Sequence, residues 1–326
     1  MPEPSPTPKR HGRLLRFGAA LVVLLAVAGY LTVQYLTGGT GAPGCKVVSG
    51  KGDGASYEFT PEQAVNAATI AAVGTGRGMP ERAVTIALAT ALQESGLRNI
   101  QHGDRDSLGL FQQRPSQGWG TPKEIMDPTY ASGVFYEHLA KVPGYSRLPL
   151  TVAAQRVQRS GFPQAYAKHE PDAVLLAAAL TGRSAATLTC SGRPAATRAM
   201  GADAVRAALV RDFGRDVVQE AGAEVGDGAS PTPTTSTASG AEERTVTLPV
   251  PADTGTAGAG RSAGQRGWQL AHWAVANATA LHIQRVSFAG REWTAGITDS
   301  RWRATGADSS GGAERDSTAV RIVTAH

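Results

Sequence analysis

Hydrophobic residues recur at helical spacing along residues 60–190. The segment Thr60–Gln63 (TPEQ) has the residues of a capping box, with proline at the first helical position, and predicts a helix over about residues 61–73. The next helix begins near Pro80 and ends before Gly96. Further helices are expected at residues 128–140, 150–159 and 171–181. The pattern predicts a compact, mostly α-helical domain over residues 60–190.

The segments that flank this domain on either side are more polar. Residues 37–59 are glycine-rich and predict a tether. Residues 191–221 are a helical extension, with an amphipathic helix expected at 203–219. Residues 222–264 are rich in Pro, Thr, Gly and Ala. Because the segment has few large apolar side chains, their burial cannot offset the conformational entropy lost on ordering. The composition therefore predicts a disordered linker.

Residues 265–326 regain apolar patterning. A helix rich in Trp and Ala is expected at residues 266–281. The β-type segments IQRVSF and REWT flank Ala289–Gly290 and predict a hairpin, and residues 319–323 predict a third strand. The C-terminal segment is therefore expected to be a small α+β module.

The N-terminal region contains an uncharged run of apolar residues at 17–36. A helix of that length spans about 30 Å, the thickness of the bilayer core, so the run predicts a transmembrane helix. Basic residues in the preceding tail, residues 1–16, indicate that this tail is cytoplasmic and that residues 37–326 lie outside the cell membrane. The alternative is a signal peptide cleaved near Ala28 and a secreted protein. The whole chain is thus expected to be mostly α.

Charge excludes one class of partner. The formal net charge is +5, from 32 basic and 27 acidic side chains. Much of the excess lies in residues 1–36, and the remainder of the chain is close to balanced. Because nucleic-acid binding requires clustered cations, we expect no nucleic-acid partner.

Cys45 and Cys190 are the two cysteines of the chain, and they flank the helical domain. An even cysteine count outside the cytoplasm indicates a disulfide. No pair of histidines accompanies them in the sequence, so a metal site is not expected, and no cofactor is predicted.

Glu94 is the first candidate for chemistry. It lies in the last turn of an apolar helix, where partial burial and the negative end of the helix dipole both disfavour its charge. Both effects raise the pKa of the carboxyl group. A carboxylic acid that keeps its proton near neutral pH is what glycosidic cleavage needs, because the leaving oxygen must be protonated.

Two short motifs carry a family resemblance. Glu94-Ser95-Gly96, followed by Ser107–Gln112 (SLGLFQ), resembles the paired motifs of the lysozyme-like superfamily, with soluble lytic transglycosylases and goose-type lysozymes as the most similar members. Phe111 stands where those proteins commonly have methionine. The resemblance covers about residues 60–181.

The resemblance implies a lysozyme-like catalytic domain that cleaves the glycan strand of peptidoglycan. Glu94 would be the general acid and then the base, Ser107 and Gln112 would position the saccharide, and Tyr166 would orient the acid. Trp119, in the loop sequence QGWG, is either a surface on which a sugar stacks or a residue that packs the loop.

Asp104 and Asp106 bear on the reaction outcome. A hydrolase needs a second carboxylate to activate water, whereas a transglycosylase uses groups of its own substrate. Aspartates in such a loop are also typical turn formers, and we favour that role. The sequence therefore predicts a lytic transglycosylase, with a lysozyme-type hydrolase as the variant.

The C-terminal module resembles the last part of a zinc D-alanyl-D-alanine peptidase-like domain of the hedgehog-like fold. The histidine ligands of that family are missing from residues 316–321, and His272 and His282 have no third ligand nearby in the sequence. The expected role is wall binding or packing, without zinc. A non-catalytic, membrane-anchored wall-binding or scaffold protein with a lysozyme fold is the alternative for the whole chain, and no envelope protein is indicated as its partner.

Overall fold

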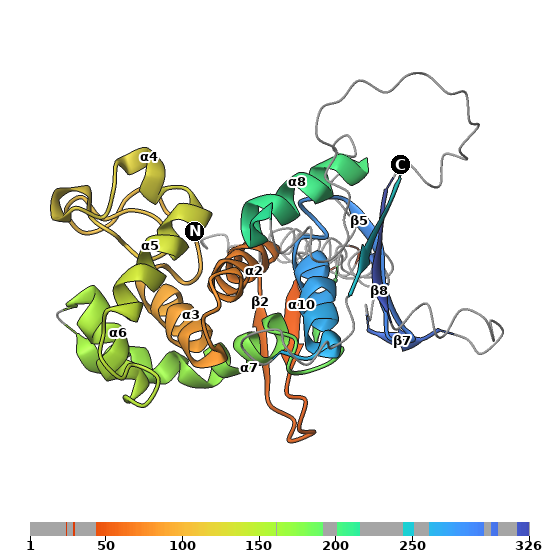
Figure 1. Cartoon of the computed structure of the whole chain (residues 1–326), viewed down its shortest axis with the longest axis horizontal. Coiled ribbons are helices and arrows are strands. Elements are labelled where there is room, and N and C mark those ends of the chain that lie inside the picture. Colours follow the sequence, from red (N-terminus) through yellow and green to blue (C-terminus); the bar gives the residue numbers. More distant parts are fainter. Residues whose placement is uncertain are drawn as a thin grey trace, which may run out of the picture. The chain divides into compact units, whose positions relative to one another are not determined.

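The computed structural model describes residues 44–160, 162–191, 201–215, 244–250, 261–296, 301–305 and 318–325, together with Leu24 and Gly29. The chain divides into two units, Met1–Ala42 and Pro43–His326. All elements discussed below belong to the second unit (Figure 1).

The predicted helices are confirmed to within a few residues. They are α2 (Pro61–Gly76), α3 (Glu81–Ser95), α5 (Pro128–Ala140), α6 (Leu150–Gln158), α7 (Glu170–Leu180), α8 (Gly201–Phe213) and α10 (Ala263–Ala276), joined by the short helix α4 (Pro122–Ile125) and the 3₁₀ helices η1 (Pro115–Gln117) and η2 (Pro163–His169). Thr60 and Gln63 form the expected capping box of α2. Residues 216–219 of the helix predicted at 203–219 lie outside the described residues.

Helix α3 is the centre of the helical part. It packs against α2, α5, α6, η2 and α7. Almost all of its residues from Ala83 to Leu92 are small or apolar and are buried, which lets the surrounding helices approach it on every side. Gly96 ends the helix in the left-handed conformation, with φ of 63°.

Two antiparallel sheets occur within the described residues. The first has the strand order β2-β1-β3, and the second has the order β4-β8-β5-β6-β7. The strands are β1 (Cys45–Val48), β2 (Ser56–Phe59), β3 (Leu188–Cys190), β4 (Thr245–Pro249), β5 (Ile283–Phe288), β6 (Arg291–Thr294), β7 (Arg303–Ala304) and β8 (Ala319–Thr324). The predicted hairpin is confirmed as β5 and β6, and the predicted third strand as β8.

The disulfide expected from the cysteine count is confirmed. Cys45 of β1 lies directly opposite Cys190 of β3, and their sulfur atoms are bonded. The bridge joins the beginning and end of the helical part across a sequence separation of 145 residues.

The expectation of a mostly α protein is wrong. The segment 37–59, taken for a tether, contains β1 and β2, and the segment 222–264, taken for a linker, contains β4 and the first residues of α10. These strands are only four or five residues long, and β1 and β4 pair with strands far away in the chain, so local hydrophobic periodicity does not reveal them.

The transmembrane helix predicted at residues 17–36 finds no support among the described residues. No helix in the described part of the chain is long and apolar enough to cross a membrane. Of residues 17–36 the structure describes only Leu24 and Gly29.

Helix α10 joins the five-stranded sheet to the helical part. It contacts β5 and β8 on one side and α2 and α7 on the other, as Figure 1 shows. Gly267 lies directly against the Phe288 ring of β5, where a Cβ atom would overlap the ring. Gly182, after α7, approaches the backbone of Gln265 equally closely. Such close approaches require glycine at both positions.

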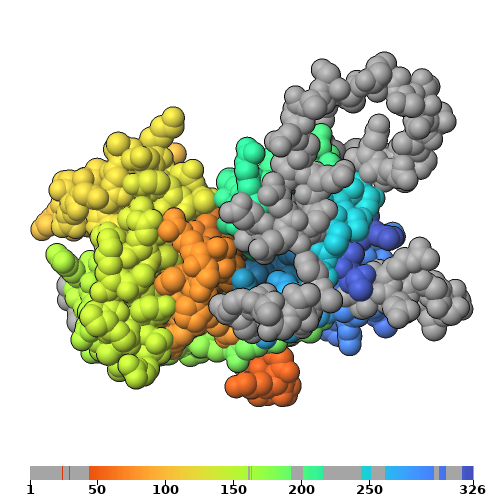
Figure 2. All heavy atoms as spheres, viewed as in Figure 1, coloured from red at the N-terminus to blue at the C-terminus, as the bar shows by residue number. Residues whose placement is uncertain are grey.

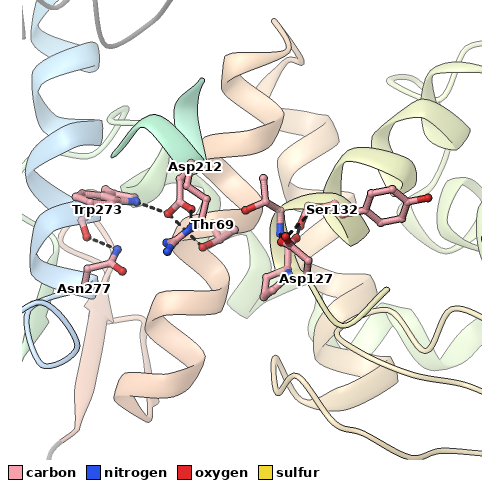
Figure 3. A network of polar contacts seen from close by, with 10 residues as sticks. Thr69, Asp127, Ser132, Asp212, Trp273 and Asn277 are labelled. Carbon is pink, nitrogen blue, oxygen red and sulfur yellow. Dashed lines mark hydrogen bonds and ion pairs between the residues drawn. The ribbon is translucent and has the colours of Figure 1, made fainter. Parts of the chain in front are cut away.

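A buried polar network stabilises the packing of α10 on the helical part. The fully buried carboxylate of Asp212, in α8, accepts hydrogen bonds from Trp273 Nε1 of α10 at 2.8 Å and from Thr69 Oγ1 of α2 at 3.2 Å (Figure 3). Arg211 Nε also donates to it at 2.8 Å. Because the Asp212 carboxylate bonds to side chains of both α2 and α10, the C-terminal region is bound to the helical part by specific contacts.

Candidate active site

Glu94 lies at the end of the buried helix α3. The Gly96 and Leu97 amides donate to the carbonyls of Leu92 and Ala91 and close the helix immediately after Glu94 and Ser95. The glutamate is therefore carried on a rigid element but projects from its last turn, and its side chain is only partly buried. A group at such a position can both touch a substrate and keep a fixed place.

Tyr166 is the residue that contacts Glu94 most directly. Its hydroxyl donates a hydrogen bond of 2.7 Å to Glu94 Oε1. Tyr166 lies in η2, is fully buried, and reaches α3 because η2 packs against that helix. Burial and the neighbouring Glu94 raise the pKa of Tyr166, so the phenol stays protonated and remains a donor.

Gln158, the last residue of α6, also affects the acidity of Glu94. Its Nε2 donates to the Phe111 carbonyl at 2.7 Å, and its side chain helps to lower the pKa of Glu94. Sequence reasoning missed this residue. The available signal was a pair of glutamines, Gln155 and Gln158, one turn apart in a helix that otherwise needed apolar residues on that side.

The acidity of Glu94 is the result of opposing effects. Burial raises the pKa of the Glu94 carboxyl group, and hydrogen bonds from Tyr166 and Gln158 lower it, with burial the larger effect. Glu94 therefore holds its proton at a higher pH than an ordinary glutamate does. A carboxyl group that holds a proton, and whose neighbours stabilise it once the proton has left, can act as an acid and afterwards as a base.

The segment Ser107–Gln112 is held against the same end of α3. Ser95 Oγ donates to the Leu110 carbonyl at 2.8 Å, and Leu108 and Gln113 exchange two backbone hydrogen bonds of 3.0 Å that close a tight turn. Gly109 has φ of 74°, and a Cβ atom there would lie 2.7 Å from the Ile125 carbonyl oxygen. The two motifs recognised in the sequence are thus in direct contact.

The two residues assigned to saccharide positioning both lie in this turn region. Ser107 is buried, and its amide donates to the Asp104 carbonyl. Gln112 is half-buried, has φ of 48°, and donates from Nε2 to the Gly109 carbonyl at 3.2 Å. Its side-chain oxygen lies directly over Gly103. Gln112 is therefore held in a strained, left-handed backbone conformation.

Asp106 is committed to the loop structure. Its carboxylate accepts hydrogen bonds from Ser116 N at 2.9 Å and Arg114 Nε at 2.7 Å. Hydrogen bonds from Ser116 and Arg114 hold the pKa of Asp106 far below its ordinary value. Such a carboxylate stays ionised but is a weak base, because its oxygens are already bonded. Asp104 is exposed, and its carbonyl accepts the turn hydrogen bond from Ser107.

Trp119 packs into the loop rather than standing free. About 9% of the residue is exposed, and its ring stacks on the His138 ring of α5 with centroids 4.2 Å apart. Little of the indole surface is left for a sugar, so these contacts favour the packing alternative.

The C-terminal histidines have other partners. His272 is completely buried in α10, with Nδ1 2.8 Å from the Ala179 carbonyl oxygen and Nε2 accepting from Thr187 N at 3.2 Å. Among the described residues no cluster of three or more His, Cys, Asp or Glu side chains could hold a metal ion.

In Figure 2 the surface of residues 100–160, in yellow to yellow-green, and that of the C-terminal strands, in cyan to blue, lie on opposite sides.

No family model matches the chain, and no curated protein matches it. The resemblance to lysozyme-like proteins therefore rests on the two motifs and on the contacts described above.

Proposed function

We propose that this protein cleaves the glycan strand of peptidoglycan, at the bond between the muramoyl sugar and N-acetylglucosamine, as a lytic transglycosylase. The observation that carries the proposal is the hydrogen bond between Tyr166 and Glu94 at the end of a buried helix. It holds a carboxyl group of raised pKa in one orientation, directly beside the turn that contains Gln112.

In the first step, protonated Glu94 gives its proton to the glycosidic oxygen while the bond from that oxygen to the muramoyl C1 breaks. The acetamido group of the muramoyl sugar stabilises the positive charge that develops at C1. In the second step, the Glu94 carboxylate takes the proton of the sugar's own hydroxymethyl group, whose oxygen bonds to C1 and closes an anhydro ring. Glu94 ends the cycle protonated, and no water is consumed.

The state of the loop aspartates supports a transglycosylase over a hydrolase. Water attack needs a carboxylate able to accept a proton on the far side of the sugar. Asp106 is bonded to Arg114 and Ser116 and has a lowered pKa, and Asp104 takes part in a turn. Asp106 therefore lacks the features of a general base, and the turn role is the one favoured for Asp104, so the substrate hydroxyl is the better candidate for the nucleophile.

The Cys45–Cys190 disulfide supports activity outside the cytoplasm, because such bonds persist in oxidising compartments. Peptidoglycan is located there, so substrate and compartment agree.

The test is muropeptide release from purified peptidoglycan by the full chain and by Glu94→Gln, which keeps the shape of the side chain but cannot donate a carboxylic proton. The rate should fall by at least about 100-fold. Glu62→Gln is the control, because Glu62 is an exposed acid in the first turn of α2. Near-normal release by Glu94→Gln would refute the acid role. Sedimentation with the wall but no release by the wild type would favour a non-catalytic wall-binding protein.

A further inference from the structure

The chain leaves helix α3 through a strained backbone segment, directly after the turn that carries Glu94. Gly96 and Leu97 are both left-handed, with φ of 63° and 59°. Glycine adopts this conformation freely, whereas in leucine the Cβ atom crowds the backbone, so the conformation costs free energy. It persists only where the surrounding contacts hold it in place.

Two side chains of α2 hold the carbonyl groups of this segment. Gln63 Nε2 donates a hydrogen bond of 2.8 Å to the Gly96 carbonyl, and Asn66 Nδ2 donates one of 2.8 Å to the Leu97 carbonyl. Residues three positions apart lie on the same face of a helix, so both amides can reach α3, against which α2 packs. The Gly96 and Leu97 amides donate back into the last turn of α3, so each residue is bonded through both of its backbone groups.

The contact made by Asn66 is shielded from solvent. Asn66 is only 6% exposed, and Leu97 is completely buried. Water therefore cannot replace the Asn66 amide at the Leu97 carbonyl, and loss of the amide would leave a buried acceptor without a partner.

Gln63 has a second bond that fixes its position. Its Oε1 accepts from the Thr60 amide at 2.7 Å in the capping box of α2, while its Nε2 reaches the Gly96 carbonyl. One side chain thus joins the first turn of α2 to the end of α3.

We propose that Gln63 and Asn66 are positioning residues, which fix the end of α3 and through it the direction in which Glu94 points. This inference rests on the proposed function. Glu94 lies two residues before Gly96, so a shift of the held segment loosens the turn that carries the carboxyl group. The Tyr166 hydroxyl, 2.7 Å from Glu94 Oε1, is fixed on another element and cannot follow such a shift.

The test combines two measurements on the full chain with the variants Gln63→Glu and Asn66→Leu. Glutamate also serves in a capping box, so Gln63→Glu keeps the start of α2 and loses only the donor to Gly96. Amide hydrogen exchange over residues 91–98 should become about tenfold faster in each variant, the size expected for one lost hydrogen bond.

The second measurement is the kinetics of cleavage of soluble, uncross-linked glycan strands. A misdirected acid slows the chemical step, so kcat should fall on the order of tenfold. KM should stay near the wild-type value, because the residues assigned to saccharide positioning lie in the other motif, at Ser107 and Gln112.

Thr60→Ala is the matched control. It removes the hydroxyl that accepts from the Gln63 amide at 3.3 Å, but leaves the Gln63 side chain and its bond to Gly96. The free energy of unfolding should fall. Amide exchange over residues 91–98 and kcat should both match the wild type.

The outcomes separate this inference from the function. If Glu94→Gln is inactive while Gln63→Glu keeps the wild-type kcat, the positioning role is wrong and the function stands. An equal loss of kcat in Thr60→Ala would also contradict the role, because general destabilisation would then explain the loss. If Asn66→Leu fails to fold, Gln63→Glu decides, since residue 63 is only half-buried. Normal activity of Glu94→Gln would refute the function and the positioning role together.

Discussion

Tyr166 and Glu94 are 72 positions apart in the chain, and the tyrosine hydroxyl donates a hydrogen bond of 2.7 Å to Glu94 Oε1. The tyrosine is fully buried while the glutamate is only partly covered. Tyr166 is therefore the fixed member of the pair, and Glu94 is the member that a substrate can reach. This relationship links the packing of η2 on α3 to the chemistry of the carboxyl group.

Removal of the tyrosine donor should change the acidity of Glu94. In Tyr166→Phe the ring still fills its site, but one of the two hydrogen bonds that oppose the effect of burial is lost, so the pKa of Glu94 rises. The alkaline limb of the pH profile should move to higher pH and the maximal rate should fall. Tyr136→Phe is the control, because the buried Tyr136 hydroxyl donates instead to the Ile70 carbonyl. An unchanged limb in Tyr166→Phe would contradict the orienting role.

Glu94 should lower the stability of the protein at neutral pH. Burial raises its pKa in the folded state, so the folded protein binds more protons than the unfolded chain, and stability falls as pH rises from the unfolded pKa through the folded pKa. Glu94→Gln removes this penalty and should stabilise the protein by an amount on the order of 1 kcal/mol at pH 7. Urea unfolding at pH 4 and pH 7 checks this. The gain should shrink at pH 4, and a loss of stability at pH 7 would contradict the burial effect.

Loss of the disulfide should destabilise the fold. The Cys45–Cys190 bond closes a long loop and joins β1 to β3. The double variant Cys45→Ser/Cys190→Ser should lose about 2–5 kcal/mol in the free energy of unfolding. Thiol labelling of the unfolded, unreduced wild type should detect no free cysteine. Two reactive thiols per chain would contradict the bond.

His272 should make the protein sensitive to acid. Burial lowers its pKa to about 4, below the ordinary value of 6.5. At pH values between 4 and 6.5 this histidine binds more protons in the unfolded chain than in the folded protein. The free energy of unfolding should therefore fall by about 3 kcal/mol, for this group, as the pH drops from 6.5 to 4.

The measurement for His272 is the free energy of urea unfolding at pH 7, 5.5 and 4.5. His272→Phe should be less stable than the wild type at pH 7, because the Thr187 amide and the Ala179 carbonyl lose their partner. Its further loss between pH 7 and 4.5 should be smaller than that of the wild type. Equal pH slopes for the two proteins would show that His272 does not titrate as described.

Local sequence signals were sufficient to predict the helices and part of the candidate active site. Capping at Thr60, the stop at Gly96 and the apolar spacing between them depend on neighbouring residues, so they can be read from sequence. Strands β1 and β4 could not be read in this way, because each is short and pairs with a strand far along the chain.

The site shows the same division. Glu94, Ser107 and Gln112 belong to recognisable motifs, and the pairing of Tyr166 with Glu94 followed from the family resemblance. Gln158 was missed because its hydrogen bond to the Phe111 carbonyl joins α6 to a segment far away in the chain. Only the packing of α6 on α3 brings these groups together, and no spacing in the sequence encodes that contact.

The central claim is that Glu94 cleaves glycan strands by closing an anhydro ring on the substrate itself. The most direct measurement is mass analysis of the muropeptides released by the full chain, with and without borohydride reduction. The account predicts anhydro-muropeptides whose masses do not change on reduction, because they have no reducing end. Products that gain two hydrogens would contradict it, since water would then be the acceptor and a carboxylate such as Asp104 would have to supply the base.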